Sequence, residues 1–208
     1  MRLVVAKEPL RRILKWAQRA LFVCAILLLG YCAFALVDAW TFQRRESMDL
    51  DRLLRDRRAE SVGAPAAATN GLIGRIEIPR LHLSAIVIEG IDRTTLRRGV
   101  GHIPGTALPG EGGNVGLSAH RDTFFRPLKD LKVKDEIEFS TLKGDYRYEV
   151  ESLRVVEPSD VGVLAPSTEN RLTLVTCYPF FYIGAAPKRF VVRARQVSPQ
   201  TLARSSVK

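Results

Sequence analysis

Residues 20–37, ALFVCAILLLGYCAFALV, form a run of eighteen uncharged and mostly apolar residues. A helix rises about 1.5 Å per residue, so this run spans roughly 27 Å, enough to cross the hydrocarbon core of a bilayer. Trp16 and Trp40 flank the run, where aromatic residues favour the membrane interface. The sequence therefore predicts a transmembrane helix over residues 20–40, and the remainder of the 208-residue chain has room for one medium domain.

The charges around this run predict its orientation. Residues 1–19 hold six basic residues and one acidic residue, which the positive-inside rule places in the cytoplasm. A cleaved signal peptide is the alternative, but a small-x-small cleavage site is hard to find, and residues 32–35 come closest. Both interpretations export the C-terminal part of the chain. We expect a single-pass protein of the cytoplasmic membrane, with a cytoplasmic N-terminus and an extracellular or periplasmic domain.

The N-terminal tail explains much of the chain's excess of basic residues. The formal net charge is +10, and the N-terminal tail accounts for half of it. The remaining excess is scattered along the exported part rather than clustered on one segment, which argues against nucleic-acid binding. A solvated surface or an anionic partner in the cell envelope is the better interpretation.

The exported part divides into three regions by composition. Residues 41–60 are highly charged, with leucines at helical spacing, and residues 61–71 are small with Pro and Gly. We therefore expect a stalk and linker over residues 41–71, a folded domain over residues 72–197, and a short tail over residues 198–208.

Short strand-like segments dominate the folded domain. They are rich in β-branched or alternating residues and are bounded by Gly and Pro. The expected strands are 72–78, 83–89, 114–119, 135–139, 146–151, 171–177 and 189–197. Residues 94–100 suggest a helical turn, and residues 123–131 a short helix capped by Asp122 or Thr123. About eight short strands with few helices indicate an all-β barrel or sandwich.

Cysteine usage singles out one residue. Cys24 and Cys32 lie in the apolar run, which leaves Cys177 alone in the exported domain, where it has no disulfide partner. Cys177 ends a predicted strand just before Tyr178, and Thr176 beside it offers a hydroxyl donor. A strand end is a rigid platform with solvent access. The residue is either a reactive thiol or a buried inert one, and the count alone does not distinguish the two.

A reactive thiol needs partners. Arg189 begins the next predicted strand and returns close to Cys177 if the two strands pair as a hairpin; an arginine there favours the thiolate and binds a developing oxyanion. A proton carrier is also required, normally histidine. His82, His102 and His120 are the candidates, and the small residues before His120 favour it by leaving space beside the imidazole.

Signatures of other chemistries are absent from the sequence. It contains no HExxH, no CxxC and no GxSxG, and its EGGNVG turn lacks the GK[ST] of a phosphate loop. The sequence predicts neither a metal nor a cofactor.

Three segments resemble the sortase family. Residues 173–177, TLVTC, are similar to its TLxTC motif; residues 117–121, LSAHR, to its histidine segment; and residues 188–192, KRFVV, to the strand that bears its arginine. The order of the three segments also fits. The segments HRDTFFRPL and TCYPFFYIGAAPKRFVVRA are most similar to class D sortases, and the resemblance covers residues 72–197 together with the anchor.

The resemblance implies a closed eight-stranded β-barrel with short helices, and it implies His120, Cys177 and Arg189 as catalytic residues. The implied enzyme is a cysteine transpeptidase that cleaves an LPxT-type sorting signal after Thr through a thioacyl intermediate. Its partners would be secreted proteins with a C-terminal sorting signal and an amine acceptor, either a cell-wall precursor or a protein amine. The alternatives are an exported cysteine peptidase that only hydrolyses and a non-catalytic barrel that binds the envelope.

Overall fold

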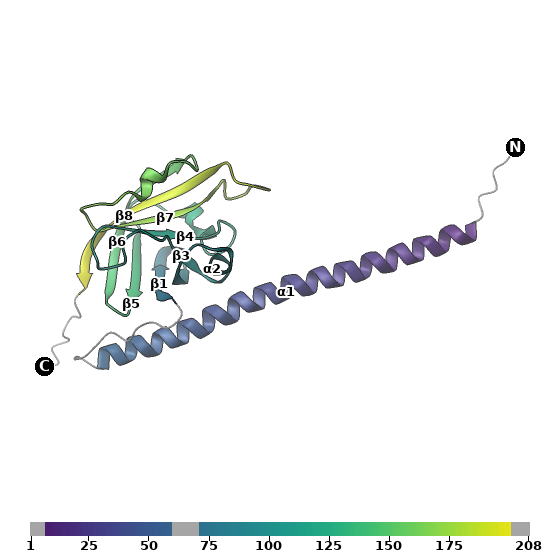
Figure 1. The fold of residues 1–208 in the computed structure, drawn as a ribbon, viewed down its shortest axis with the longest axis horizontal. Helices are drawn as coiled ribbons and strands as arrows, with labels where there is room; N and C mark the ends of the chain where they lie inside the picture. Colours follow the sequence, from purple (N-terminus) through teal and green to yellow (C-terminus); the bar gives the residue numbers. More distant parts are fainter. Residues whose placement is uncertain (1–6, 60–70, 201–208) are drawn as a thin grey trace. The chain divides into compact units, whose positions relative to one another are not determined.

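The computed structural model describes residues 7–59 and 71–200 (Figure 1). The chain divides into two units, one that ends at Thr41 and one that begins at Phe42. The helix α1 (Lys7–Ala59) contributes to both, and the second unit also holds all the strands.

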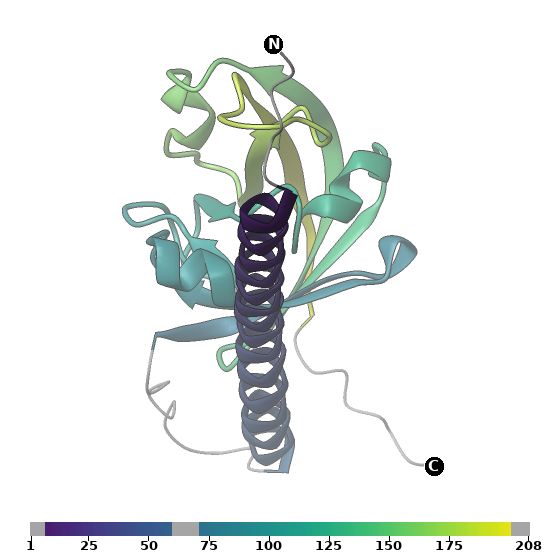
Figure 2. The same cartoon turned by 90° about the vertical axis from the view of Figure 1, so that its right-hand side faces the viewer.

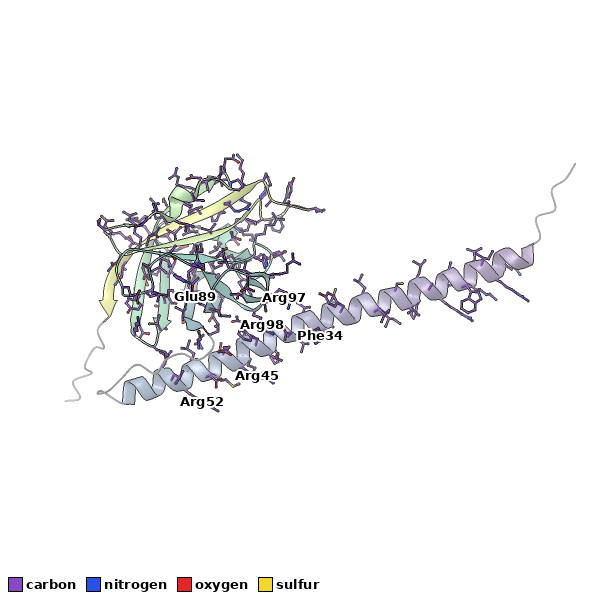
Figure 3. All side chains as sticks on the ribbon, in the orientation of Figure 1. Phe34, Arg45, Arg52, Glu89, Arg97 and Arg98 are labelled. Carbon is purple, nitrogen blue, oxygen red and sulfur yellow. The ribbon has the colours of Figure 1, made fainter. Side chains whose placement is uncertain are left out.

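The part of α1 in the first unit carries the apolar run. Within the described residues, one helical segment, Arg11–Leu54, is long and apolar enough to cross a membrane, with a mean hydropathy of 2.7 over its most apolar 18 residues. Large apolar side chains of the run are exposed, among them Leu21 and Leu29. Phe34, labelled in Figure 3, is exposed as well. α1 is helical from Lys7 to Ala59, and Figure 2 shows its coils from the N-terminal end. Length, composition and exposure agree with the predicted membrane helix.

The strands close into a barrel with the order β1-β2-β3-β4-β7-β8-β6-β5. The pairs β2–β3 and β4–β7 are parallel, and the other pairs are antiparallel. This architecture decides between the barrel and the sandwich that the strand pattern left open. The strands are β1 (Leu72–Ile78), β2 (Leu83–Glu89), β3 (Val100–His102), β4 (Asn114–Ser118), β5 (Glu136–Thr141), β6 (Asp145–Val156), β7 (Arg171–Tyr178) and β8 (Lys188–Gln200).

Short helices lie in the connections. They are η1 (Pro79–Leu81), α2 (Arg93–Arg98), η2 (Arg126–Asp130) and η3 (Val161–Leu164). Asp92 caps α2 by accepting hydrogen bonds from the amides of Thr94 and Thr95, at 2.8 and 3.2 Å. The helix expected over residues 123–131 is shorter, since η2 is a 3₁₀ turn preceded by Phe125 with no side-chain cap. The cap predicted at Asp122 or Thr123 was therefore wrong.

Two strands differ from their sequence pattern for local reasons. β3 spans three residues, too few for an alternating pattern to show. β6 continues to Val156, well past the predicted end, and its pairing with β8 shifts between Val150 and Ser152. Such a bulge offsets the alternation of the strand, so its second half no longer continues the pattern of the first.

Alternation along β7 shows how the barrel is filled. Leu172 and Leu174 are fully buried in the central cluster, together with Phe139 and Tyr148 from β5 and β6. Burial raises the pKa of the Tyr148 phenol well above its ordinary value, because the phenolate would lose its hydration. The centre of the barrel is thus a packed apolar core, and functional groups have to lie on its outer face or rim.

The second unit begins with the last part of α1, which packs against β1 and β2. Leu50 is fully buried in a cluster with Leu72 and Ile86. The Gln43 side chain accepts a hydrogen bond from the Ile86 amide at 3.1 Å and donates one to the Arg98 carbonyl.

Further contacts connect the same part of α1 to the barrel. Arg75 of β1 donates to the Ser47 carbonyl at 3.1 Å and forms an ion pair with Asp51 at 3.0 Å. The Arg98 guanidinium lies 5.2 Å from the Phe42 ring centroid. α1 extends to Ala59, and residues 61–70 of the predicted linker lie outside the described residues, as do residues 201–208 of the predicted tail. The predicted division at Leu72 stays a prediction.

Below neutral pH, the carboxylate of Asp135 is expected to set part of the pH dependence of stability. Hydrogen bonds from Arg80 and from the Lys132 amide lower the pKa of Asp135 below its ordinary value. A lowered pKa in the folded state adds stability above the unfolded pKa, near 3.9, and this stability is lost as pH falls through the folded pKa. Asp135→Asn should lower the free energy of unfolding at pH 7, and the deficit should shrink as pH falls through the folded-state pKa of Asp135.

Urea unfolding across pH would measure this difference, with Asp130→Asn as the matched control. The side chain of Asp130 forms an exposed ion pair with its neighbour Lys129, which contributes little to stability. A deficit for Asp135→Asn that persisted unchanged at low pH would contradict the assignment.

Candidate active site

Cys177 lies on the outer face of the barrel near the end of β7. Alternate residues of a strand point to opposite faces, and Leu174 and Thr176 are buried, whereas Val175 and Cys177 are half-buried. The thiol is therefore supported by a packed strand and reachable from solvent.

Arg189 is the direct partner of Cys177 in the antiparallel pair of β7 and β8. Residues directly opposite in such a pair carry their side chains on the same face, with Cβ atoms about 4.5–5.5 Å apart. The Arg189 guanidinium donates to the carbonyls of Ala186 and Lys188, at 3.2 and 3.0 Å. The hairpin predicted from the sequence is confirmed, and it places Arg189 opposite Cys177 in the strand register.

His120 approaches Cys177 from the other side of β7. β4 pairs in parallel with β7, with Ser118 opposite Val175, and the Ala119 amide donates to the Val175 carbonyl at 3.4 Å. His120 follows Ser118 by two residues, as Cys177 follows Val175, so both lie at the same level of the barrel. The side chain of His120 is exposed. The strand register thus places the segment of His120 and the strand of Arg189 on either side of the strand that carries Cys177.

The other two histidines have different surroundings. His82 lies exposed in the turn between β1 and β2, with a positive φ of 50°. His102 is 3% exposed, with Nδ1 2.8 Å from a carboxylate oxygen of Glu89 and Nε2 3.0 Å from both the Ala107 carbonyl and the Thr106 hydroxyl. Because protein groups occupy both ring nitrogens of His102, neither nitrogen is free to exchange protons with a substrate.

Thr176 connects the backbone of the histidine segment to the cysteine strand. Its side chain is buried, and the hydroxyl donates to the Ala119 carbonyl at 2.7 Å. Ala119 precedes His120 as Thr176 precedes Cys177, so this bond constrains the separation of the two segments. The sequence showed that a donor was present but gave no sign of its partner.

An apolar wall lies beside the outer face of β7, the face that carries Cys177. Val163 and Leu164 of η3 pack with Val191 and with Val175, which lies two residues before Cys177. This produces an apolar surface that leads along the outer face toward the thiol.

A buried amide holds this wall in place. The Asn114 side chain donates to the carbonyls of Val163 and Ala165, both at 3.2 Å, and accepts from the Thr173 hydroxyl at 2.7 Å. Sequence reasoning missed Asn114; the signal was a polar residue at the start of an apolar strand.

A cavity of about 790 Å³ lies elsewhere, and its lining includes Asn170 and Arg171 at the start of β7. Cys177 is near the other end of that strand, so the cavity is remote from it. Charged groups of the lining pair with neighbours, as Arg171 does with Glu151 at 2.8 Å. Within residues 7–59 and 71–200, no three His, Cys, Asp or Glu side chains gather as a metal site would require.

Comparisons with known proteins identify the family. A family model described as "Sortase domain" matches residues 76–197. Sortase D of Bacillus subtilis (strain 168) is 30% identical over 193 residues, which cover 86% of this chain and 97% of that protein. The chain belongs to the sortase family. The resemblance drawn from the three segments is confirmed, and the protein is a cysteine transpeptidase.

Solved sortase structures share the fold. A Clostridium perfringens Sortase D5 transpeptidase matches with a TM-score of 0.61 and 27% identity, over 76% of this chain and 97% of the other. Sortase A from Corynebacterium diphtheriae matches with a TM-score of 0.59 and 32% identity, over 65% of each chain. The similarity to sortases named D agrees with the class D resemblance.

Removal of the Thr176 hydroxyl should impair this sortase without removing any reacting group. Thr176→Val leaves the buried Ala119 carbonyl without its donor, so we expect a loss of about 1–3 kcal/mol in the free energy of unfolding. The family resemblance implies that His120 and Cys177 react together, so a shift of one relative to the other should also lower kcat by about tenfold or more. Urea unfolding and peptide turnover would measure both, with Thr176→Ser as the control that keeps the hydroxyl. A valine variant with wild-type kcat would show that this bond does not position the histidine.

Proposed function

We propose that this sortase cleaves an LPxT-type sorting signal after its threonine and transfers the acyl group to an amine. The observation that supports this most is the strand register around β7, with Arg189 opposite Cys177 on one side and His120 at the same level on the other. A nucleophile, a cation and a proton carrier therefore share the outer face of the barrel.

In the first half of the reaction, the Cys177 thiolate attacks the carbonyl carbon of the threonine residue, and a carbon–sulfur bond forms. Arg189 stabilises the negative charge that develops on the carbonyl oxygen. His120, as the imidazolium, donates a proton to the departing amine while the carbon–nitrogen bond breaks. The products are a thioacyl enzyme and the free C-terminal part of the signal.

In the second half, His120 is neutral and accepts a proton from the incoming amine. The amine attacks the thioacyl carbon, a new amide bond forms, and the Cys177 thiolate leaves. The proton count returns to its starting value. Water in place of the amine would give a carboxylate and no transfer, so the acceptor decides between transpeptidation and hydrolysis.

The apolar surface beside the thiol supports a peptide substrate with apolar residues. Val175 and Leu164 are both half-buried next to the outer face. We infer that the leucine and proline of the signal contact this surface while its threonine reaches Cys177.

The anchor supports a role at the membrane. We propose that residues 20–40 span the cytoplasmic membrane and contact its lipid, with residues 1–19 inside and the catalytic barrel, residues 72–197, outside. Secreted proteins with a C-terminal sorting signal would then be the acyl donors. A cell-wall precursor or a protein amine would be the acceptor, and the result would be attachment of proteins to the cell surface.

The test uses the full chain in detergent with a library of LPxTG- and LPxTA-type peptides and an excess of a simple amine. Mass spectrometry is expected to detect the new amide, and the preferred peptide identifies the signal. An amide product that requires Cys177 would establish transfer. Cleavage with only the carboxylate product, at every amine concentration, would instead favour the hydrolytic cysteine peptidase.

A further inference from the structure

The connection between β7 and β8, residues 179–187, lies between two of the proposed catalytic residues. It leaves just after Cys177 and returns just before Arg189. Its conformation therefore bears on the relative position of both side chains, in addition to the strand pairing that sets their register.

An aromatic cluster holds the base of this connection. The ring centroids of Phe180 and Phe190 are 5.2 Å apart, and Tyr178 lies 6.0 Å from Phe180 and 6.3 Å from Phe190. Such contacts stabilise a loop where it joins the sheet.

The tip of the connection lacks that apolar support. The side chains of Phe181 and Ile183 are 72% and 101% exposed. Gly184 has a φ of +96°, which shapes the turn, but a Cβ added there would meet no atom within 4 Å. The tip has to be held by something other than packing.

Arg121 holds the tip of the connection through hydrogen bonds. Its Nη2 donates to the carbonyls of Tyr182 and Gly184, at 2.8 and 3.1 Å, one on each side of Ile183. The guanidinium also lies 5.8 Å from the Tyr182 ring centroid. Arg121 directly follows His120 in the chain, so this contact joins the histidine segment to the connection that bears Cys177 and Arg189 at its ends.

We propose that Arg121 is a positioning residue for transpeptidation, which fastens the β7–β8 connection to the histidine segment and thereby sets His120 against Cys177 and Arg189. The inference rests on the catalytic roles proposed above for those three residues. Arg121 acts through them and takes no part in bond making itself.

The chemistry of the contact explains why arginine is needed. Two carbonyl oxygens accept from one guanidinium nitrogen, while the planar group lies near an aromatic ring, a combination that the ammonium of lysine does not reproduce. Nη1 of Arg121 is also buried and has no hydrogen-bond partner among the described residues. An uncompensated buried donor costs stability, so the contact is not optimised for stability alone.

Arg126 of η2 provides a matched control, because it contacts the same β7–β8 connection. Its guanidinium lies 5.7 Å from the Phe181 ring centroid, and its side chain is exposed. Within the described part of the chain, it donates to no carbonyl of the connection. Arg126→Ala therefore removes a positive charge and a ring contact from the tip while it leaves the fastening bonds in place.

The experiment measures kcat and KM of the full chain with its preferred peptide and amine for Arg121→Ala, Arg121→Lys and Arg126→Ala. A positioning role predicts that kcat falls about 10- to 100-fold in both Arg121 variants, because a small misplacement of reacting groups lowers the rate steeply. KM for the peptide should change less than about threefold. Arg126→Ala should stay within about twofold of wild type in both constants.

Two further readouts separate positioning from a loss of structure. The urea midpoint of each variant shows whether it is folded, and Arg121→Lys serves if Arg121→Ala does not fold. The pH profile of kcat should change shape in the Arg121 variants, since the proton exchange between His120 and the reacting groups is disturbed, and it should be unchanged in Arg126→Ala.

Several results would overturn the proposal. An Arg121→Lys variant with wild-type kcat would show that charge alone is sufficient, and a rise in KM without a fall in kcat would assign Arg121 to peptide binding. If kcat fell only in proportion to the fraction of folded protein, Arg121 would have a structural role and no positioning role. If the wild-type chain formed no amide, the proposed function would fail instead. The alkylation rate of Cys177 in the same variants would then test whether Arg121 positions His120 against the thiol.

Discussion

Alanine in place of Cys177 is expected to lower amide formation to background, by about four orders of magnitude or more. Among residues 7–59 and 71–200, the other two cysteines lie on α1 and not in the barrel. The same change should abolish rapid labelling of the barrel by an alkylating reagent. Turnover and labelling are thus predicted to disappear together, while the urea midpoint of the barrel changes little, because the half-buried thiol lies outside the packed core.

A chain with Cys24→Ala and Cys32→Ala is the matched background for this measurement. Both residues are exposed on α1 in the apolar run, and they would otherwise contribute labelling of their own. This double variant should retain wild-type turnover and label only at Cys177. Amide formation that survived Cys177→Ala in this background would refute the thioacyl mechanism.

His120→Asn and Arg189→Ala test the other two roles in the same background. Loss of a general acid and base typically costs about 10²–10⁴-fold in rate. Both variants should keep a thiol that can be labelled, in contrast to Cys177→Ala. If either retained wild-type kcat, that residue would have no part in the proposed mechanism.

The second large effect is expected at Leu50 of α1. Leu50 is fully buried against Leu72 and Ile86, although the helix around it has the composition of a charged stalk. Leu50→Ala removes buried apolar surface and leaves a cavity, so the free energy of unfolding should fall by about 2–4 kcal/mol. Denaturant unfolding of the full chain in detergent would measure it.

Met48→Ala is the matched control, because this side chain on the same helix is 48% exposed. It should change the free energy of unfolding by less than about 0.5 kcal/mol. Equal effects of the two changes would mean that α1 does not pack on β1 and β2 in solution. A difference of the expected size would support the packing of the last part of α1 on the barrel, within the unit that begins at Phe42.

Local patterns along the chain were sufficient for several parts of the molecule. The apolar run, the strand that ends at Cys177 and the strand that begins at Arg189 follow from composition and alternation, because each depends on residues close in sequence. The hairpin that brings Arg189 to Cys177 could be anticipated for the same reason. The choice of His120 and of a barrel required the family resemblance, since residues alone left three histidines and two all-β folds open.

Contacts between segments that lie far apart in the sequence could not be predicted from local patterns. Three such contacts join parts of the chain that lie far apart in sequence. They are the hydrogen bond from Thr176 to Ala119, the hydrogen bonds from Arg121 to the β7–β8 connection, and the packing of Leu50 on the barrel. Leu50 in particular lies in a charged helical segment, and periodicity cannot tell a helix that packs on a barrel from one that stands in solvent.

An apolar helix, a β-rich domain and a lone thiol at a strand end could all be inferred from the order of the amino acids, because these features depend on neighbouring residues. The fold was needed to show that β4 and β8 flank β7, with Arg189 opposite Cys177 and His120 just after β4. It was also needed to show that Arg121 donates hydrogen bonds to the loop between β7 and β8. Strand pairing and side-chain hydrogen bonds of this kind depend on closure of the whole barrel, and no local pattern encodes that closure.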